Sequence, residues 1–303
     1  MINTVSFDKL GIHDIVLNRV AISNIFGTGL DVYWYAIIIT AGLVLAMLFG
    51  MKHAKDVGLN ADNILDVVIF GVPCALIGAR LYYVIFEADQ FHSFTDIINI
   101  RKGGLAIYGG LIAGLIVGLV YSKVKKINVL ALFDIACMGF FIGQSIGRWG
   151  NFVNAEAFGG VTDLPWGMSI NGGAPVHPTF LYESLWNLVG FILAYIYLKK
   201  LRKENGEIFF FYLAWYGAGR AWVEGLRTDS LWLGGIRVSQ LVAGVSFIIG
   251  TTLIILVRTG VWGKIMNRFR KDTPAYAPVF SDRAAPDSEV TDMDPENKPD
   301  SGK

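Results

Sequence analysis

Seven long apolar runs constrain this chain more than any other feature of its sequence. A helix needs roughly 20 mainly apolar residues to cross the hydrocarbon core of a bilayer, and each run is close to that length. The runs lie at about 32–51, 64–87, 104–122, 129–147, 179–198, 208–226 and 237–257. Hydrophobic residues make up 53% of the chain and charged residues only 17%, whereas soluble domains carry about 25% charged residues. The sequence therefore predicts an all-α polytopic membrane protein with seven transmembrane helices.

Lysine and arginine alternate between the two sides of the predicted helices. They cluster after the first, third, fifth and seventh runs, at Lys52 and Lys55, Lys123, Lys125 and Lys126, Lys199, Lys200, Arg202 and Lys203, and Arg258 and Lys264. Because cytoplasmic connections are enriched in these residues, we expect the clusters to be cytoplasmic. The N-terminus then lies outside, the C-terminus lies in the cytoplasm, and the connections near 88–103, 148–178 and 227–236 face outward.

The chain divides into three predicted parts. Residues 1–30 interleave apolar and polar side chains and are expected to rest on the outer face as a surface-lying segment. Residues 31–260 form the predicted membrane domain, with an outer-face loop or head region at 148–178. Residues 261–303 begin basic and become rich in Asp, Glu, Pro and Ser after Asp272, a composition that cannot bury enough surface to fold. They are expected to be a disordered cytoplasmic tail.

The sequence gives no support for nucleic-acid binding, a reactive cysteine or a metal site. No basic stripe is present that could hold the phosphates of a nucleic acid. Cys74 and Cys137 lie in apolar runs, without the spacing of a metal site or a disulfide framework, and are expected to be unreactive. The histidines also lack metal-ligand spacing; they are His13, His53, His92 and His177. No metal and no cofactor is implied.

Polar side chains gather toward the outer ends of the predicted helices. An ionisable residue near the bilayer centre costs about 2.5–3.5 kcal/mol on insertion scales, so each one needs a partner or a function. At about 1.5 Å per residue, side chains from five runs fall at one depth: Arg80, Tyr108, Arg148, Glu183, Arg220 and Glu224. On the sixth run Tyr216, Arg220, Glu224 and Arg227 follow at helical spacing and form one stripe. Arg220 and Glu224 could simply neutralise each other at i,i+4, but that leaves Arg227 unexplained.

The end of the fourth run carries a dense polar motif between Gly147 and Gly159. Its glycines allow the backbone to approach a ligand closely. Arg148 offers a planar donor fork suited to phosphate, and Asn151 and Asn154 add neutral donors. Singly, each residue has an ordinary explanation, because an arginine can extend to the interface and an asparagine can cap a turn. Together they predict a site for a phospholipid headgroup.

Two further segments allow both a structural and a functional interpretation. Glycine pairs flank Tyr108 at 103–104 and 109–110, and such pairs often mark close helix packing in membranes. The segment from His177 to Glu183 opens the fifth run, where Pro and Thr are common helix-start residues. Glu183 is the unusual member of that segment. The fourth run is the least apolar, with Asp134 and Gln144, and is the one most easily broken or tilted.

These motifs resemble those of the phosphatidylglycerol-prolipoprotein diacylglyceryl transferases, which begin bacterial lipoprotein maturation. Residues 147–159 match the family signature G-R-x-G-N-F-x-N-x-E-x-x-G in full, and the resemblance extends over residues 30–260. Supporting matches are Trp34 and Tyr35, the glycine pair before Tyr108, His177 and Pro178, Tyr182 and Glu183, and Tyr216, Arg220, Glu224 and Arg227.

The resemblance implies transfer of a diacylglyceryl group from phosphatidylglycerol to the thiol of the lipobox cysteine of a prolipoprotein, forming a thioether and releasing glycerol 1-phosphate. It implies a multi-pass protein of the bacterial inner membrane with its active site in the outer half of the bilayer. The catalytic candidates are Arg148, Arg220, Glu156 and Tyr108. The substrate-binding candidates are Arg148, Asn151, Asn154, Gly159, Tyr35, Glu183, Tyr216, Glu224 and Arg227. Since the substrate peptide supplies the nucleophile, no reactive enzyme cysteine is required.

One position departs from the family pattern. Many members carry a histidine between the glycine pairs, where this chain has Tyr108. A tyrosine with an ordinary pKa near 10 is a poor base at neutral pH. The acceptor of the thiol proton therefore stays open among Glu156, Glu224 and Tyr108.

Two other functions are alternatives to the transferase. A secondary transporter or channel for an anionic substrate would use the same arginines, but such proteins usually have repeated halves and a site near the midplane. This sequence shows no internal repeat, and its polar groups crowd the outer half. A lipid phosphotransferase of another kind would need an Asp-rich metal-binding run, which is absent from the sequence.

Overall fold

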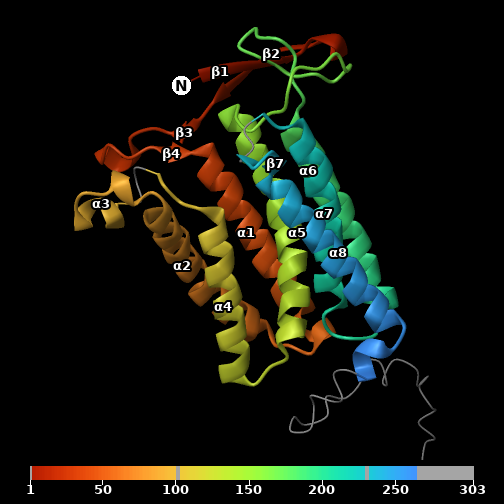
Figure 1. Cartoon of the computed structure of the whole chain (residues 1–303). Coiled ribbons are helices and arrows are strands. Elements are labelled where there is room, and N and C mark those ends of the chain that lie inside the picture. Colours follow the sequence, from red (N-terminus) through yellow and green to blue (C-terminus); the bar gives the residue numbers. More distant parts are fainter. Residues whose placement is uncertain (1, 100–102, 229–231, 265–303) are drawn as a thin grey trace, which may run out of the picture. The chain divides into compact units, whose positions relative to one another are not determined.

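Long helices form most of the structure, which is a computed structural model describing residues 2–99, 103–228 and 232–264. Within this part of the chain, seven helices have 18 or more residues and run side by side in one bundle (Figure 1). They are α1 (Trp34–His53), α2 (Ala61–Phe86), α4 (Ile107–Lys125), α5 (Val129–Asn154), α6 (Thr179–Ile196), α7 (Glu207–Leu226) and α8 (Val238–Arg258). The short helix α3 (Phe94–Ile98) lies between α2 and α4. Single turns occur at Asp8–Leu10, Ile25–Gly27, Ala54–Val57 and Ala88–Gln90, and a π-helical turn at Tyr197–Leu201 extends α6.

Six of these helices are long and apolar enough to cross a membrane. The candidate spans are Trp34–Val57, Ala61–Phe86, Ile107–Lys125, Val129–Asn154, Thr179–Leu201 and Val238–Arg258. Helix α7, which carries Glu207, Arg220 and Glu224, is not among them. The outward faces of the spans are apolar, as Phe70, Leu111 and Ile248 show by their exposure. The chain is therefore a multi-pass membrane protein.

Helix α5 is continuous from Val129 to Asn154, although the sequence marks it as the run most easily broken. Its acidic residue, Asp134, accepts hydrogen bonds from the backbone N–H groups of Gly206 and Phe209, at 2.8 and 2.9 Å. The Arg202 side chain lies 3.4 Å from the same carboxylate. Asp134 thus satisfies free N–H groups at the start of α7, which is a structural role.

The N-terminal segment is a β-structure, so the all-α prediction is wrong for this part of the chain. Strands β1 (Ile2–Phe7), β2 (Ile12–Asn18) and β5 (Ser169–Ile170) form an antiparallel sheet in the order β2-β1-β5. Two small ladders join β3 (Val20–Ile22) to β4 (Val32–Tyr33) and β6 (Trp232–Leu233) to β7 (Ile236–Arg237). The alternation of apolar and polar residues reflects a strand, with one side buried.

The three-stranded sheet joins two segments that the sequence treats separately. Val5 pairs with Ile170, so the N-terminal residues and the 148–178 region share one sheet. Val5, Leu17, Met168 and Phe180 form its buried core. The sheet lies above the ends of the helices where α6 begins (Figure 1). Residues 1–30 are therefore anchored to the region that contains the signature motif.

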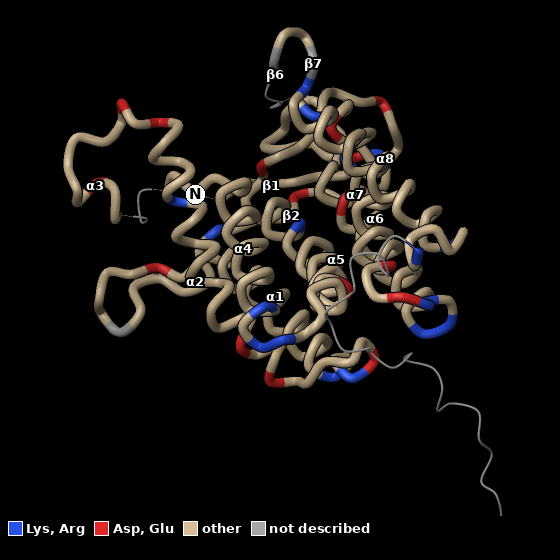
Figure 2. The backbone as a smooth tube through the Cα atoms, turned by 60° about the horizontal axis from the view of Figure 1, so that its bottom comes forward, with Lys and Arg blue, Asp and Glu red and all other residues tan. Residues whose placement is uncertain are grey.

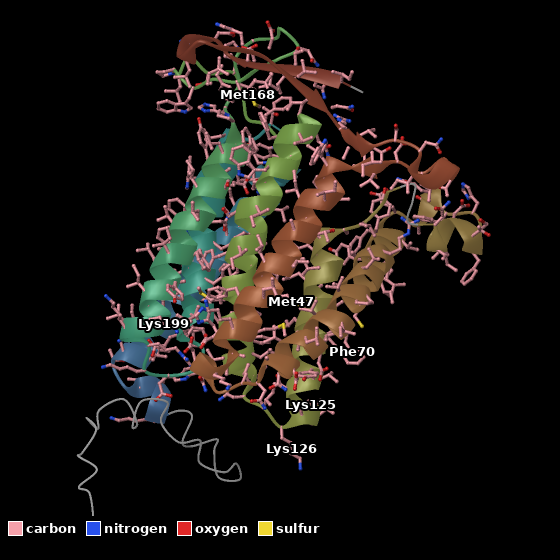
Figure 3. All side chains as sticks on the ribbon, turned by 180° about the vertical axis from the view of Figure 1, so that it is seen from behind. Met47, Phe70, Lys125, Lys126, Met168 and Lys199 are labelled. Carbon is pink, nitrogen blue, oxygen red and sulfur yellow. The ribbon has the colours of Figure 1, made fainter. Side chains whose placement is uncertain are left out.

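Many of the charged residues lie in the segments that connect the helices (Figure 2). Lys125, Lys126 and Lys199 lie at one end of the bundle and Met168 lies at the opposite end (Figure 3). At the lysine-bearing end, Lys199 pairs with Asp56 at 2.5 Å. The predicted tail falls largely on residues 265–303, which lie outside the described residues.

Helices α7 and α8 approach closely because glycines remove the side chains between them. A Cβ atom at Gly250 would come within 2.5–2.6 Å of backbone atoms of Ala214 and Phe210 on α7. By contrast, a Cβ atom at Gly244 on the same helix meets nothing within 4 Å. The two glycines therefore form a matched pair for testing this interface.

The Gly250→Ala variant is expected to be less stable than the wild type by about 1–3 kcal/mol, because the methyl group would push α8 away from α7. Reversible unfolding in mixed micelles measures the difference. The Gly244→Ala variant serves as the control and should unfold like the wild type. Equal stability of the two variants would show that α7 and α8 can separate without cost.

Candidate active site

Three arginines, one in α5, one in α7 and one directly after α7, surround one buried carboxylate. Glu183, in the first turn and a half of α6, is only 8% exposed. Arg148 of α5 forms an ion pair with it, while Arg220 and Arg227 each place an Nη1 atom 3.6 Å from its Oε1 atom. The residues that the sequence distributes over three runs therefore meet at one group. We call Arg148, Glu183, Arg220, Glu224 and Arg227 the arginine cluster.

Glu224 supplies the second carboxylate of the arginine cluster. It is 1% exposed and pairs with Arg220 at 2.6 Å, one helical turn earlier on α7. The i,i+4 pair considered from the sequence is thus real, but Arg220 also reaches Glu183. Guanidinium groups held close together in a partly buried site are suited to bind an anion such as a phosphate.

The signature motif forms a polar chain that leads away from the arginine cluster. Arg148 donates to the side-chain oxygen of Asn151 at 3.3 Å, and the amides of Asn151 and Asn154 both donate to Glu156 at 3.1 Å. Helix α5 ends there, because Ala155 adopts the left-handed conformation with φ of 51° and turns the chain back. Glu156 is exposed and reaches the cluster through Asn151.

Gly159 and Tyr35 bring neighbouring segments against this motif. A Cβ atom at Gly159 would lie 2.8 Å from the carbonyl oxygen of Leu226, and Gly159 forms a β-bridge with Arg227. This contact joins the signature motif to the end of α7. The ring of Tyr35, at the start of α1, fills the space beside Gly150, where a Cβ atom would lie 2.7 Å from it. Both residues shape the site by close backbone packing.

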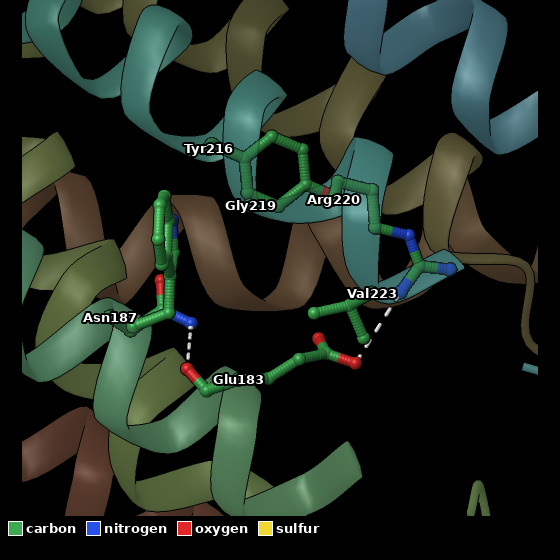
Figure 4. A pocket seen from close by; sticks show the side chains of 7 residues that line it. Glu183, Asn187, Tyr216, Gly219, Arg220 and Val223 are labelled. Atoms are coloured by element: carbon green, nitrogen blue, oxygen red, sulfur yellow. Dashed lines mark hydrogen bonds and ion pairs between the residues drawn. The ribbon is translucent and has the colours of Figure 1, made fainter. Parts of the chain in front are cut away.

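A very small pocket, with a cavity volume of about 10 Å³, lies between α6 and α7 beside the arginine cluster. The side chains of Glu183 and Arg220 point toward each other across it, next to Tyr216 (Figure 4). Its lining residues are Glu183, Trp186, Asn187, Tyr216, Gly219, Arg220 and Val223. Asn187 donates to the backbone carbonyl of Glu183 at 2.7 Å. The pocket therefore combines a charged side with aromatic walls.

Tyr108 and Arg80 do not join the arginine cluster, in contrast to their predicted convergence with it. The Tyr108 ring lies 6.4 Å from that of Tyr82, and the side chain makes no hydrogen bond or ion pair with the described residues of the cluster. Arg80 bonds only to backbone carbonyl oxygens among its recorded hydrogen bonds. Depth along a helix alone did not reveal which way these side chains face.

The structure adds residues that sequence reasoning did not select. Trp149 donates to the Ser184 hydroxyl at 3.2 Å, and Ser184 donates to the Ser145 carbonyl at 2.8 Å, so α5 and α6 are joined next to the cluster. Arg19 of the N-terminal segment donates to the backbone carbonyl of Asn154 at 2.5 Å. Trp149 and Ser184 directly follow the predicted site residues Arg148 and Glu183 in the sequence, and this adjacency could have identified them. No sequence feature pointed to Arg19, because its contact with Asn154 spans 135 residues.

Comparison with known proteins agrees with the resemblance of the motifs. The family described as prolipoprotein diacylglyceryl transferase matches residues 23–256. A phosphatidylglycerol--prolipoprotein diacylglyceryl transferase of Finegoldia magna is 48% identical over 240 residues, covering 79% of this chain and 95% of the relative. Proteins named for the same transferase in Clostridium perfringens and Clostridioides difficile are 47% and 44% identical, covering 75% and 73% of this chain and 90% and 89% of their own lengths. The chain belongs to the prolipoprotein diacylglyceryl transferase family.

Proposed function

We propose that this protein transfers the diacylglyceryl group of phosphatidylglycerol to the lipobox cysteine of a prolipoprotein. The observation that carries the proposal is the convergence of Arg148 and Arg220 on the buried carboxylate of Glu183. The phosphodiester of phosphatidylglycerol bears one negative charge, which these guanidinium groups are suited to bind. Guanidinium forks suit phosphate oxygens because they donate two parallel hydrogen bonds.

The reaction replaces a carbon–oxygen bond with a carbon–sulfur bond. The cysteine sulfur attacks the glycerol carbon of the lipid, the bond from that carbon to the phosphate oxygen breaks, and glycerol 1-phosphate leaves. The leaving group gains negative charge as the bond breaks, and Arg148 and Arg220 are placed to stabilise it. The thiol loses its proton; Glu156, Glu224 and Tyr108 are the candidate acceptors.

The remaining candidates bind and shape the substrate site. Asn151 and Asn154 add neutral donors next to Arg148, and Tyr216 forms a wall of the pocket beside Arg220. Glu183 and Glu224 hold the guanidinium groups apart and in place. Gly159 and Tyr35 contribute through close packing. These assignments rest on geometry and on the matched signature.

We infer that α7 is the seventh crossing, with the N-terminus outside and the C-terminus in the cytoplasm of the bacterial inner membrane. Glu183 lies near the start of α6, whereas Lys199 and Lys200 follow its other end, so the positive-inside rule favours the outer leaflet for the arginine cluster. Exposed tryptophans support a membrane interface at the cluster end: Trp34, Trp149, Trp166 and Trp222. The division into residues 1–30, 31–260 and 261–303 is retained as part of this proposal.

An anion transporter or channel, the alternative from the sequence, gains no support. The relatives described above are named as transferases. The arginine cluster lies near the helix ends, whereas transporter sites usually lie near the midplane. Its carboxylates also bridge three helices tightly, with Glu183 contacting arginines from α5 and from the α7 end.

Direct detection of the product tests the proposal. Purified protein is incubated with phosphatidylglycerol vesicles and a synthetic peptide that contains a lipobox cysteine. Mass spectrometry should show a diacylglyceryl adduct on the peptide, and glycerol 1-phosphate should appear in equal amount. A peptide with serine in place of the cysteine is the control and should stay unmodified. Unmodified cysteine peptide under conditions where the lipid binds would overturn the proposal.

The Tyr108→Phe variant separates proton transfer from packing at this position. The change removes the hydroxyl group but keeps the ring beside Tyr82. If Tyr108 passes or stabilises the proton, transfer should slow by about 10²-fold, within the range found for positioned acid–base groups. The pH–rate profile should also lose one of its limbs. An unchanged rate and profile would remove Tyr108 from proton transfer.

A further inference from the structure

Arg80, near the outer end of α2, is a buried arginine whose donors are all occupied. The side chain is 8% exposed, and a guanidinium group has five N–H donors. All five are directed to backbone carbonyl oxygens at 2.7–3.1 Å: those of Asp96, Ile97, Asn99, Gly103 and Gly104. The guanidinium also lies 5.0 Å from the centre of the Phe91 ring. No donor remains for an anion, which separates Arg80 from the arginine cluster.

The first glycine pair gives the chain the shape that this arrangement needs. Gly103 and Gly104 both adopt positive φ angles, 86° and 78°, which residues with a Cβ atom rarely adopt. Their carbonyl oxygens consequently turn toward the same Nη1 atom of Arg80, at 2.7 and 2.8 Å. A Cβ atom at Gly104 would lie 2.5 Å from that nitrogen. The positive φ angles of the two glycines thus make the hydrogen bonds to Arg80 possible.

Two neighbours of Arg80 hold the first turn of α4. The backbone N–H of Ala106 donates to the carbonyl oxygen of Ala79 at 3.0 Å, just before α4 begins. One turn on, the backbone of Gly109 lies directly against that of Gly78, with no room for a Cβ atom on either residue. Gly78, Ala79 and Arg80 therefore contact the chain both before and after Tyr108. We call these three residues the α2 clasp.

We propose that the α2 clasp positions Tyr108 for the transfer reaction, with Arg80 acting as a positioning residue rather than a phosphate binder. The inference rests on the proposed function. Tyr108 lies in the first turn of α4, between the residues that the clasp holds. A shift of the α4 start would move its hydroxyl relative to the arginine cluster, whereas the cluster itself is built on α5, α6 and α7.

The test compares Arg80→Ala and Gly104→Ala with the matched control Gly114→Ala. Gly114 lies on α4 where a Cβ atom meets nothing within 4 Å, so the control should behave as the wild type. Arg80→Ala and Gly104→Ala, which each disrupt the contact between the clasp and the chain before α4, should lower kcat at least tenfold while the KM for phosphatidylglycerol changes less than twofold. Backbone amides of residues 103–110 should exchange hydrogen faster in these variants, with exchange in α5, α6 and α7 unchanged. Arg80→Lys, which has three donors instead of five, should lie between wild type and alanine.

A double-mutant cycle identifies the route of the effect. If the clasp acts through Tyr108, the Arg80→Ala change should have little further effect on kcat in a Tyr108→Phe background. Multiplicative losses, or a Tyr108→Phe variant with the wild-type kcat, would overturn the positioning role. A raised KM with unchanged exchange at residues 103–110 would instead make Arg80 a lipid-binding residue and also overturn it. The exchange measurement does not depend on transfer activity, so failure of the proposed function itself would appear separately, as a wild type that forms no adduct.

Discussion

Transfer of the diacylglyceryl group is expected to fall by about 10²–10³-fold when Arg148 is replaced by alanine, the range observed when one donor to a developing negative charge is removed. Arg148 contacts both Glu183 and Asn151, so its guanidinium is fixed before the substrate arrives. It therefore needs no reorganisation as the leaving phosphate gains charge. Arg220→Ala is expected to give a loss of the same order, because Arg220 lies between the two carboxylates and lines the pocket.

The rates are measured from the mass of the peptide adduct, after confirming that each variant inserts into membranes and purifies as the wild type does. Lys200→Ala is a suitable control, because this exposed lysine lies at the opposite end of α6. Arg148→Lys should recover only part of the loss, since an ammonium keeps the charge but lacks the planar fork. Near-normal transfer by either alanine variant would exclude that arginine from stabilising the leaving group.

Replacing Glu183 with glutamine is expected to destabilise the lipid-free protein by about 3–5 kcal/mol, the cost of removing one partner from a buried ion pair. Glu183 contacts Arg148, Arg220 and Arg227, so without its charge these guanidinium groups lose the carboxylate that they share. Phosphatidylglycerol should restore part of the stability, because its phosphate supplies a negative charge at the same place. At a lipid concentration about 100 times the Kd, binding contributes about 2.7 kcal/mol.

Unfolding in lipid-free micelles and in micelles with phosphatidylglycerol measures both effects. A zwitterionic lipid with the same acyl chains controls for a general effect of lipid. Glu204→Gln, a change at an exposed carboxylate, should leave the stability unaltered. A Glu183→Gln variant as stable as the wild type without lipid would show that the arginines do not depend on this carboxylate for charge balance.

The sequence predicted the helices well because their signal is local. A run of apolar residues as long as the bilayer is thick identifies a span wherever it packs, and the predicted run at 129–147 lies within α5, which extends to Asn154. Part of the arginine cluster could also be predicted from the sequence. Charged residues are costly inside a span and so stand out, and the helical spacing placed Tyr216, Arg220 and Glu224 on one stripe of α7.

The N-terminal strands were harder to predict, because a strand is completed by its partner. Residues 2–7 pair with residues 12–18 and with the distant Ser169 and Ile170, and no local pattern announces that last pairing. The same alternation of apolar and polar residues fits a segment lying on a membrane surface. Only the buried contact of Val5 with Met168 and Phe180 distinguishes the two.

By itself the sequence determined the membrane-spanning class of the chain, the approximate bounds of its long helices, and the signature motif of its family, since each of these depends on residue type and short-range spacing. Tertiary structure decided which polar side chains lie together. It placed Glu183 against three arginines, directed Arg80 to the carbonyl oxygens before α4, and left Tyr108 outside the arginine cluster. The rotation of each helix about its axis makes that choice, and helix packing at glycines such as Gly78 and Gly109 fixes the rotation.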